Sequence, residues 1–128
     1  MSHKILTVDD SRAVRMIIQR AFTSQDCTFC QAGDGVEGLA VAAAEKPDLI
    51  ILDVTMPNMD GITMLGHLRQ NPDIKDTPVI MLTAESSREN VANVTQLGIK
   101  DYLVKPFKDE LLLEKASKII PLQAKVAA

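Results

Sequence analysis

The chain has 128 residues, a formal net charge of −3 and a pI near 5.3. This length and the 46% content of hydrophobic residues suffice for one domain to bury a core, so we expect residues 1–128 to form a single domain. The acidic balance and the scattered Lys and Arg residues argue against a nucleic-acid-binding surface. No stretch reaches the roughly 18 apolar residues of a membrane span, and the first residues do not resemble a secretory signal. We therefore expect a cytoplasmic protein with no membrane contact.

Two cysteines, Cys27 and Cys30, form a C-x-x-C pair, a spacing that also occurs in redox and zinc sites. They fall in a segment that reads as a short strand, where positions three apart lie about 10 Å from each other on opposite faces. A disulfide cannot close across that distance. His3 and His67 are the only histidines that could complete a zinc site. We expect neither redox chemistry nor metal binding from this pair.

The first half of the chain alternates short apolar runs with segments of helical pattern. Residues 4–8 are followed by an amphipathic stripe at i, i+3, i+4, i+7 and i+8, which predicts a helix through Val14, Ile17, Ile18, Ala21 and Phe22. Residues 28–32 form the next apolar run. A helix is predicted after it over residues 34–46, because Asp34 and Glu37 are suited to cap its start and Pro47 marks its end.

The second half repeats the pattern. Residues 48–52 are followed by a helix that begins after Gly61, with Asp60 as its cap, and stops before Pro72. Residues 78–82 precede a helix over residues 86–98, for which Ser86 and Glu89 supply the cap and Gly98 the end. Residues 101–104 precede a last stripe, formed by Leu112, Ala116, Ile119 and Ile120. Most of the runs lack polar alternation, which favours strands buried on both faces, so we predict a (βα)5 open α/β fold.

Polar side chains follow four of the five apolar runs. They are Asp9 and Asp10 after the first, Asp53 after the third, Thr83 after the fourth, and Lys105 with Pro106 after the fifth. The carboxyl ends of parallel strands meet at one edge of the sheet, where open α/β folds bind ligands. We therefore expect three carboxylates, a hydroxyl and an ammonium group to share that edge.

Three carboxylates so close together repel one another, by on the order of 4 kcal/mol for a pair about 4 Å apart at an effective dielectric of about 20. Lys105 supplies one compensating charge, and a divalent cation would supply two. Ligation by oxygen atoms alone is what Mg²⁺ prefers. Asp53 stands alone at the end of the most apolar run and is the natural nucleophile toward a phosphoryl group, whereas Asp9 and Asp10 form a metal-binding pair.

Each of these residues also has a simpler interpretation when it is taken alone. Asp9 or Asp10 could merely cap a helix that begins at Ser11. Lys105 could be a solvated surface lysine, and Thr83 an ordinary residue at the end of a strand. Their expected position at one edge is what favours a functional site.

Four motifs, "VDD", "LDVTMPNMDG", "LTAE" and "DYLVKPF", together resemble the receiver domain of two-component response regulators. Their order and spacing match across the whole chain. With no output domain expected in residues 1–128, the chain is most similar to the stand-alone receivers of chemotaxis. The resemblance implies a flavodoxin-like fold with a five-stranded parallel sheet in the order 2-1-3-4-5 and helices on both faces.

The resemblance also implies roles for the residues at the sheet edge. Asp53 would accept a phosphoryl group from a sensor histidine kinase. Asp10 and Asp53, with the backbone carbonyl of Thr55, would hold Mg²⁺, and Asp9 would assist through a water molecule. Lys105 would contact a phosphoryl oxygen, and the peptide bond between it and Pro106 would be cis.

A conformational switch is implied by the same resemblance. Thr83 would move toward the phosphoryl group, and Tyr102 would turn inward to fill the vacated space. The fourth helix, fifth strand and fifth helix would form the face that binds a downstream protein, of which a motor switch protein in chemotaxis is one example. The chain would be a monomer that assists its own phosphorylation and dephosphorylation without being an enzyme in the ordinary sense.

Three other functions compete with a switch that binds its target directly. The chain could be an intermediate of a multistep phosphorelay or another signalling adaptor. A Mg²⁺-dependent aspartyl phosphohydrolase usually has two aspartates two positions apart and a cap over the site, whereas Asp9 and Asp10 are adjacent. A flavodoxin-like electron carrier needs a Ser/Thr/Gly-rich phosphate loop and flanking aromatics, whereas the chain has "DDSRAV" and 3% aromatic residues.

Overall fold

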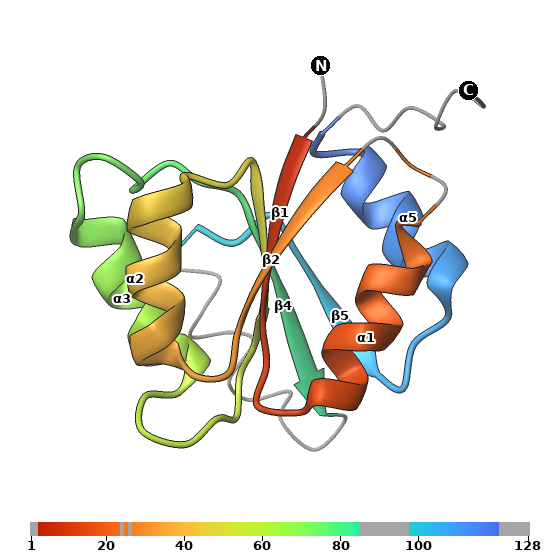
Figure 1. The fold of residues 1–128 in the computed structure, drawn as a ribbon, viewed down its shortest axis with the longest axis horizontal. Helices are drawn as coiled ribbons and strands as arrows, with labels where there is room; N and C mark the ends of the chain where they lie inside the picture. Colours follow the sequence, from red (N-terminus) through yellow and green to blue (C-terminus); the bar gives the residue numbers. More distant parts are fainter. Residues whose placement is uncertain (1–2, 24, 26, 85–97, 121–128) are drawn as a thin grey trace.

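Five parallel strands form one sheet in this protein, which is described by a computed structural model over residues 3–23, 25, 27–84 and 98–120 (Figure 1). The strands are β1 (His3–Val8), β2 (Cys27–Ala32), β3 (Leu49–Asp53), β4 (Val79–Ala84) and β5 (Asp101–Lys105). Their order in the sheet is β2-β1-β3-β4-β5, and every neighbouring pair is parallel. The predicted fold class and strand order are confirmed.

The described helices cover both faces of the sheet. They are α1 (Arg12–Ala21), α2 (Gly35–Glu45), α3 (Gly61–Gln70) and α5 (Asp109–Ser117). Figure 1 shows α2 and α3 on one side of the sheet, and α1 and α5 on the other. The helix predicted over residues 86–98 lies, apart from Gly98, outside the described residues. Within the described ranges, no helix has both the length and the apolar character needed to cross a membrane.

Two hydrophobic clusters flank the sheet. One packs the inner faces of α2 and α3 against side chains such as Leu6 and Ile50, and the other packs α1 and α5 against side chains such as Ile5 and Ile51. All residues of β3 are buried, because this central strand is covered from both sides. Such burial explains why the run "LIIL" has no polar alternation.

The two cysteines lie on opposite faces of β2. Cys27 packs against the cluster beneath α1 and α5, whereas Cys30 packs against the cluster beneath α2 and α3. No disulfide bond joins them. Burial raises the pKa of the Cys30 thiol, which disfavours the reactive thiolate. The predicted placement of the two cysteines on opposite faces of the strand is confirmed.

Three helices begin at side-chain caps, because a short polar side chain can accept a bond from an otherwise unpaired backbone N–H. Asp34 accepts from the backbone N–H of Glu37 at 2.8 Å, and Asp60 accepts from that of Thr63 at 2.7 Å, as predicted. The cap of α1 is Ser11 itself, whose Oγ accepts from Val14. The N-cap is therefore neither Asp9 nor Asp10, although Asp9 Oδ1 accepts from the backbone N–H of Ser11 at 2.8 Å.

Some boundaries differ from the prediction. Asp53 and Lys105 are the last residues of β3 and β5, and Thr83 lies within β4, so all three are held by the strands themselves. Helix α5 ends at Ser117, so Ile119 and Ile120 belong to the turn that follows, although both still pack in the cluster beneath α1 and α5. A proline at position 121 disfavours helical backbone at the residue before it.

Candidate functional site

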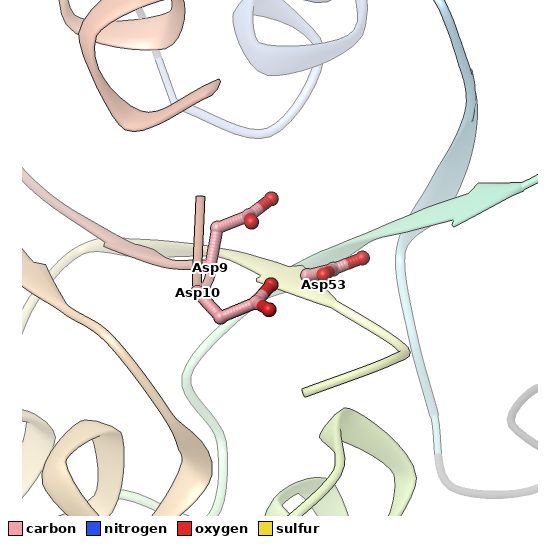
Figure 2. A group of neighbouring side chains, drawn as sticks. All are labelled: Asp9, Asp10 and Asp53. Atoms are coloured by element: carbon pink, nitrogen blue, oxygen red, sulfur yellow. The ribbon is translucent and has the colours of Figure 1, made fainter. Parts of the chain in front are cut away.

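Three carboxylates converge at the carboxyl edge of the sheet. The parallel register pairs Val8 of β1 with Leu52 of β3, so the residues that follow, Asp9 and Asp53, end these neighbouring strands at the same level. Together with Asp10, each offers a carboxylate oxygen within 4.8 Å of the others. Figure 2 shows the three side chains extending into the same space from the ends of two strands.

Lys105 bridges two of these carboxylates. Its Nζ donates to Asp9 Oδ2 and to Asp53 Oδ1, both at 3.0 Å, although β4 lies between β3 and β5 in the sheet. Asp9 and Asp53 are buried, at 0% and 5% exposure, so the ammonium group offsets charge that water does not reach. The interpretation of Lys105 as an ordinary surface lysine is therefore wrong.

The carboxyl group of Asp53 is held in an unfavourable electrostatic setting. Burial and the nearby Asp9 carboxylate raise its pKa, and the hydrogen bond from Lys105 offsets part of that rise. Burial by itself would lower the pKa of Lys105, but its bonds to the two carboxylates prevail and raise it. The site therefore holds more negative charge than its own cation balances.

The donor set fits a hard divalent cation. Three carboxylates and one ammonium group leave two negative charges, and all three carboxylates present oxygen, the ligand atom that such a cation prefers. Asp10 is exposed, and its side chain has no hydrogen bond or ion pair to any other described residue. Thr55, two residues after Asp53, is exposed.

A buried hydroxyl lies beside Asp53. Leu82 is the β4 partner of Asp53, and Thr83 is the next residue along that strand. Thr83 is 1% exposed, and its Oγ1 has no hydrogen-bond partner among the described residues. A buried hydroxyl without a partner costs about 1–3 kcal/mol, so this position favours a conformation or a ligand that would satisfy it.

Tyr102 points outward in this structure. The residue is 43% exposed, and Lys115 Nζ lies 5.8 Å from the centroid of its ring. Lys115 also forms an ion pair with Asp101 Oδ1 at 2.9 Å. The peptide bond between Lys105 and Pro106 is cis.

The loop after Asp53 is fixed by contacts that the sequence did not reveal. Asn58 adopts a left-handed backbone conformation, with φ of 65°, and its Nδ2 donates to Asp34 Oδ2 at 2.8 Å. The backbone N–H of Gly35 donates to Met59 O at 3.1 Å. The start of α2 thus holds the "MPNMD" turn. Asparagine is one of the few residues that tolerate a positive φ, which is the signal that could have identified this turn.

We predict that Lys105→Met lowers the free energy of unfolding by about 2 kcal/mol, because it leaves the buried carboxylates of Asp9 and Asp53 without their cation. Urea unfolding in EDTA at pH 7 measures the loss. The matched control is Lys4→Met, which breaks an ion pair to Glu45 whose side chains are 39% and 46% exposed and should cost less than about 1 kcal/mol. Equal losses in the two variants would contradict the prediction.

Comparison with known proteins identifies the family of this chain. The sequence model described as the response regulator receiver domain matches residues 5–117. The chain belongs to this family. It is therefore a receiver domain of two-component signalling.

Relatives of known name are longer than this chain. The response regulator MprA of Mycobacterium ulcerans is 42% identical over 121 residues, which cover 94% of this chain and 51% of MprA. The regulator of RpoS from Escherichia coli is 37% identical over 106 residues, which cover 83% of this chain and 31% of that protein. The receiver domain described here thus spans about half or less of the length of these relatives.

Solved structures of similar length share the fold. The chemotaxis protein CheY4 of Vibrio cholerae superposes with a TM-score of 0.86 at 35% identity, covering 94% of this chain and all of that one. A putative response regulator from Chloroflexus aurantiacus has a TM-score of 0.87 at 31% identity, covering 93% of this chain and 98% of its own.

Proposed function

We propose that this receiver domain is a phosphorylation-activated switch and that Asp53 is its phosphoacceptor. The observation that carries the proposal is the pairing of a buried carboxylate with a bridging lysine beside two further carboxylates. An Oδ atom of Asp53 attacks the phosphorus of a kinase phosphohistidine and forms an acyl phosphate. The P–N bond breaks, and its electron pair stays on the imidazole, which takes up a proton.

The proposed reaction requires a bound metal ion. Mg²⁺ is the best match to the oxygen donors and their charge. Asp10 and Asp53 would hold it directly with the backbone carbonyl of Thr55, and Asp9 would act through a water molecule. When bound, Mg²⁺ neutralises charge on the phosphoryl oxygens. The carboxylates of the chain set its position, and the turn after Asp53, held by Asp34, keeps the Thr55 segment in place.

Lys105 and Thr83 respond to the added charge. A phosphoryl group brings about −1.5 to −2 charges and three acceptor oxygens to the end of β3. Lys105 exchanges a carboxylate oxygen for a phosphoryl oxygen, and the Thr83 hydroxyl gains the partner that it lacks among the described residues. A hydrogen bond to a charged acceptor contributes roughly 1.5–3 kcal/mol, a substantial part of the about 5.5 kcal/mol that moves a two-state equilibrium from 1:99 to 99:1.

The switch reaches the surface through Tyr102. When Thr83 moves toward the phosphoryl group, Tyr102 turns from its exposed position into the space beside β4, which changes the surface formed by β5 and α5. The fourth helix, which would complete this output face, lies outside the described residues. A downstream protein that binds only one of the two forms reads the signal.

We further propose that the kinase is a sensor histidine kinase and that the chain acts in the cytoplasm as a monomer. Chemotaxis, with a motor switch protein as target, is supported by the likeness to CheY4 over the full length of that protein. A role as a phosphorelay intermediate or signalling adaptor would use the same phosphoacceptor. In either case residues 1–128 would act as one receiver domain.

Two rival functions have less support. An aspartyl phosphohydrolase would turn over small phosphoesters many times, whereas a switch accepts and loses a single phosphoryl group. Steady phosphate release from p-nitrophenyl phosphate, lost in Asp53→Asn, would favour the enzyme. An electron carrier would bind FMN, and the exposed Asp10 beside two further carboxylates repels the FMN phosphate.

Tyrosine fluorescence tests the proposed switch, because Tyr102 is the single tyrosine and the chain has no tryptophan. Acetyl phosphate with Mg²⁺ should change the emission of the wild type as the ring leaves solvent and Lys115. Asp53→Asn should show no change. Thr83→Ala should accept the phosphoryl group but show a smaller change in emission, because the hydroxyl that couples the two events is gone. An equal change in all three proteins would overturn the switch.

A further inference from the structure

Every polar group of Asp9 has a partner. Its backbone N–H donates to Ala32 O at 3.1 Å, which extends the β1–β2 ladder by one bond. Its Oδ1 accepts from the backbone N–H of Ser11 at 2.8 Å, and its Oδ2 accepts from Lys105. The remaining group, the main-chain carbonyl, accepts from Nη1 of Arg15 at 2.5 Å. Arg15 is the only one of these partners that contributes a charged side chain from outside the motifs of the site.

The guanidinium group of Arg15 is itself fixed at a second point. Its Nε donates to Gln31 Oε1 of β2 at 3.0 Å, and Gln31 Nε2 donates to Gln19 Oε1 of α1 at the same distance. Arg15 and Gln19 are one helical turn apart, so the network ties α1 to β2. A planar guanidinium that donates in two directions has little freedom to rotate.

The held carbonyl belongs to the peptide group that joins Asp9 to Asp10. This group is planar, so fixing the carbonyl oxygen also fixes the direction of the Asp10 N–H and the position of its Cα. The Asp10 side chain has no hydrogen bond or ion pair within the described part of the chain, so its placement depends on its backbone.

We propose that Arg15 is a positioning residue that holds the Asp9–Asp10 peptide so that the Asp10 carboxylate faces the cation site. The inference rests on the proposed function, because it assigns Arg15 a role in the binding of Mg²⁺. Residues that orient metal ligands without touching the metal typically contribute about 10- to 100-fold to affinity.

The charge of Arg15 and its proposed positioning role predict opposite effects on Mg²⁺ binding when the side chain is removed. This difference makes the inference testable. Arg15 carries a positive charge close to a site for a cation, so removing that charge should strengthen Mg²⁺ binding by electrostatics. If Arg15 positions the ligand, its removal should weaken binding instead. Arg12 is exposed on the first turn of the same helix and has no hydrogen bond or ion pair to the described residues, so Arg12→Ala reports the charge effect by itself.

The experiment is isothermal titration of Mg²⁺ into the wild type, Arg15→Ala, Arg15→Lys and Arg12→Ala at constant ionic strength, with melting temperatures recorded in EDTA. Arg15→Ala should raise the Kd for Mg²⁺ by about 10-fold or more. Arg15→Lys should also raise it, because a single ammonium group cannot reach the Asp9 carbonyl and Gln31 together. Arg12→Ala should leave the Kd unchanged or lower it.

An unchanged or lower Kd in Arg15→Ala would overturn the inference, whatever happens to the melting temperature. If Arg15→Ala does not fold, the test rests on Arg15→Lys. The inference would then be overturned if Arg15→Lys bound Mg²⁺ with the affinity of the wild type. A wild type that binds no Mg²⁺ would overturn the metal site of the proposed function, and the role of Arg15 with it. If the wild type binds Mg²⁺ and the Arg15 variants bind it as tightly, only the role of Arg15 would be overturned.

Discussion

Replacing Asp53 with asparagine should abolish phosphoryl transfer to the chain. The amide has nearly the shape of the carboxylate, but it is not a nucleophile toward phosphorus and carries no charge for Lys105 or a cation to pair with. Intact mass after incubation with acetyl phosphate and Mg²⁺ measures the loss. The control is Asp60→Asn, which changes the net charge equally nearby and keeps a side chain able to cap α3. Asp60→Asn should accept the phosphoryl group as the wild type does, and phosphorylated Asp53→Asn would contradict the prediction.

The same substitution should make the chain more stable. The pKa of Asp53 is raised above its ordinary value of 3.8, chiefly by burial, so the folded state holds its proton more tightly than the unfolded state does. Stability therefore falls as the pH rises from about 3.8 through the folded pKa, and it stays lower above that pKa. Asparagine does not titrate and avoids this loss.

In EDTA at pH 7, the free energy of unfolding of Asp53→Asn should therefore exceed that of the wild type. The excess should shrink as the pH falls through the raised pKa of folded Asp53, because the carboxyl group takes up its proton there. Urea unfolding at several pH values measures it. A variant that is less stable than the wild type at neutral pH would mean that Lys105 outweighs the cost of burying the carboxylate.

Gly61→Ala should destabilise the chain by about 3 kcal/mol, a large effect for one methyl group. A Cβ at Gly61 would overlap the backbone oxygen of Asp53 and lie 3.1 Å from the Cα of Val54. Neither contact can be relieved by a side-chain rotation, because both partners are backbone. The backbone N–H of Gly61 also donates to Val54 O at 2.8 Å, so the helix start cannot move away without losing that bond. The change would thus displace the end of β3, where Asp53 lies.

Gly66 provides the control in the same helix. A Cβ at Gly66 would meet nothing within 4 Å, so Gly66→Ala should be neutral or stabilise α3 by up to about 1 kcal/mol. Urea unfolding of both variants at pH 7 tests the comparison. Similar stabilities for Gly61→Ala and Gly66→Ala would show that the end of β3 can shift at little cost.

Much of the architecture could be predicted because the sheet is covered on both faces. The central strands of such a sheet are largely apolar runs, and the buried carboxylates Asp9 and Asp53 lie where these strands end. Asp9 and Asp53 therefore mark the functional edge in the amino-acid sequence itself. Asp34 and Asp60 mark helix starts for a similar reason, since short carboxylates there satisfy unpaired backbone N–H groups.

Side-chain contacts that join different elements could not be predicted in this way. Arg15 reaches the carbonyl of Asp9 and the edge of β2, and Asn58 reaches the start of α2, because the fold brings these segments together. Neither contact has a fixed spacing in the sequence. The contact of Lys115 with the ring of Tyr102 likewise joins two elements, α5 and β5.

Intact mass spectrometry of the wild-type chain after incubation with acetyl phosphate, with Mg²⁺ or with EDTA, tests the phosphoacceptor site most directly. We expect a single Mg²⁺-dependent gain of about 80 Da, stable in acid and labile in base as an acyl phosphate is, on the peptide that contains Asp53. No gain with Mg²⁺, or a gain located on another residue, would contradict the assignment of Asp53 as the phosphoacceptor.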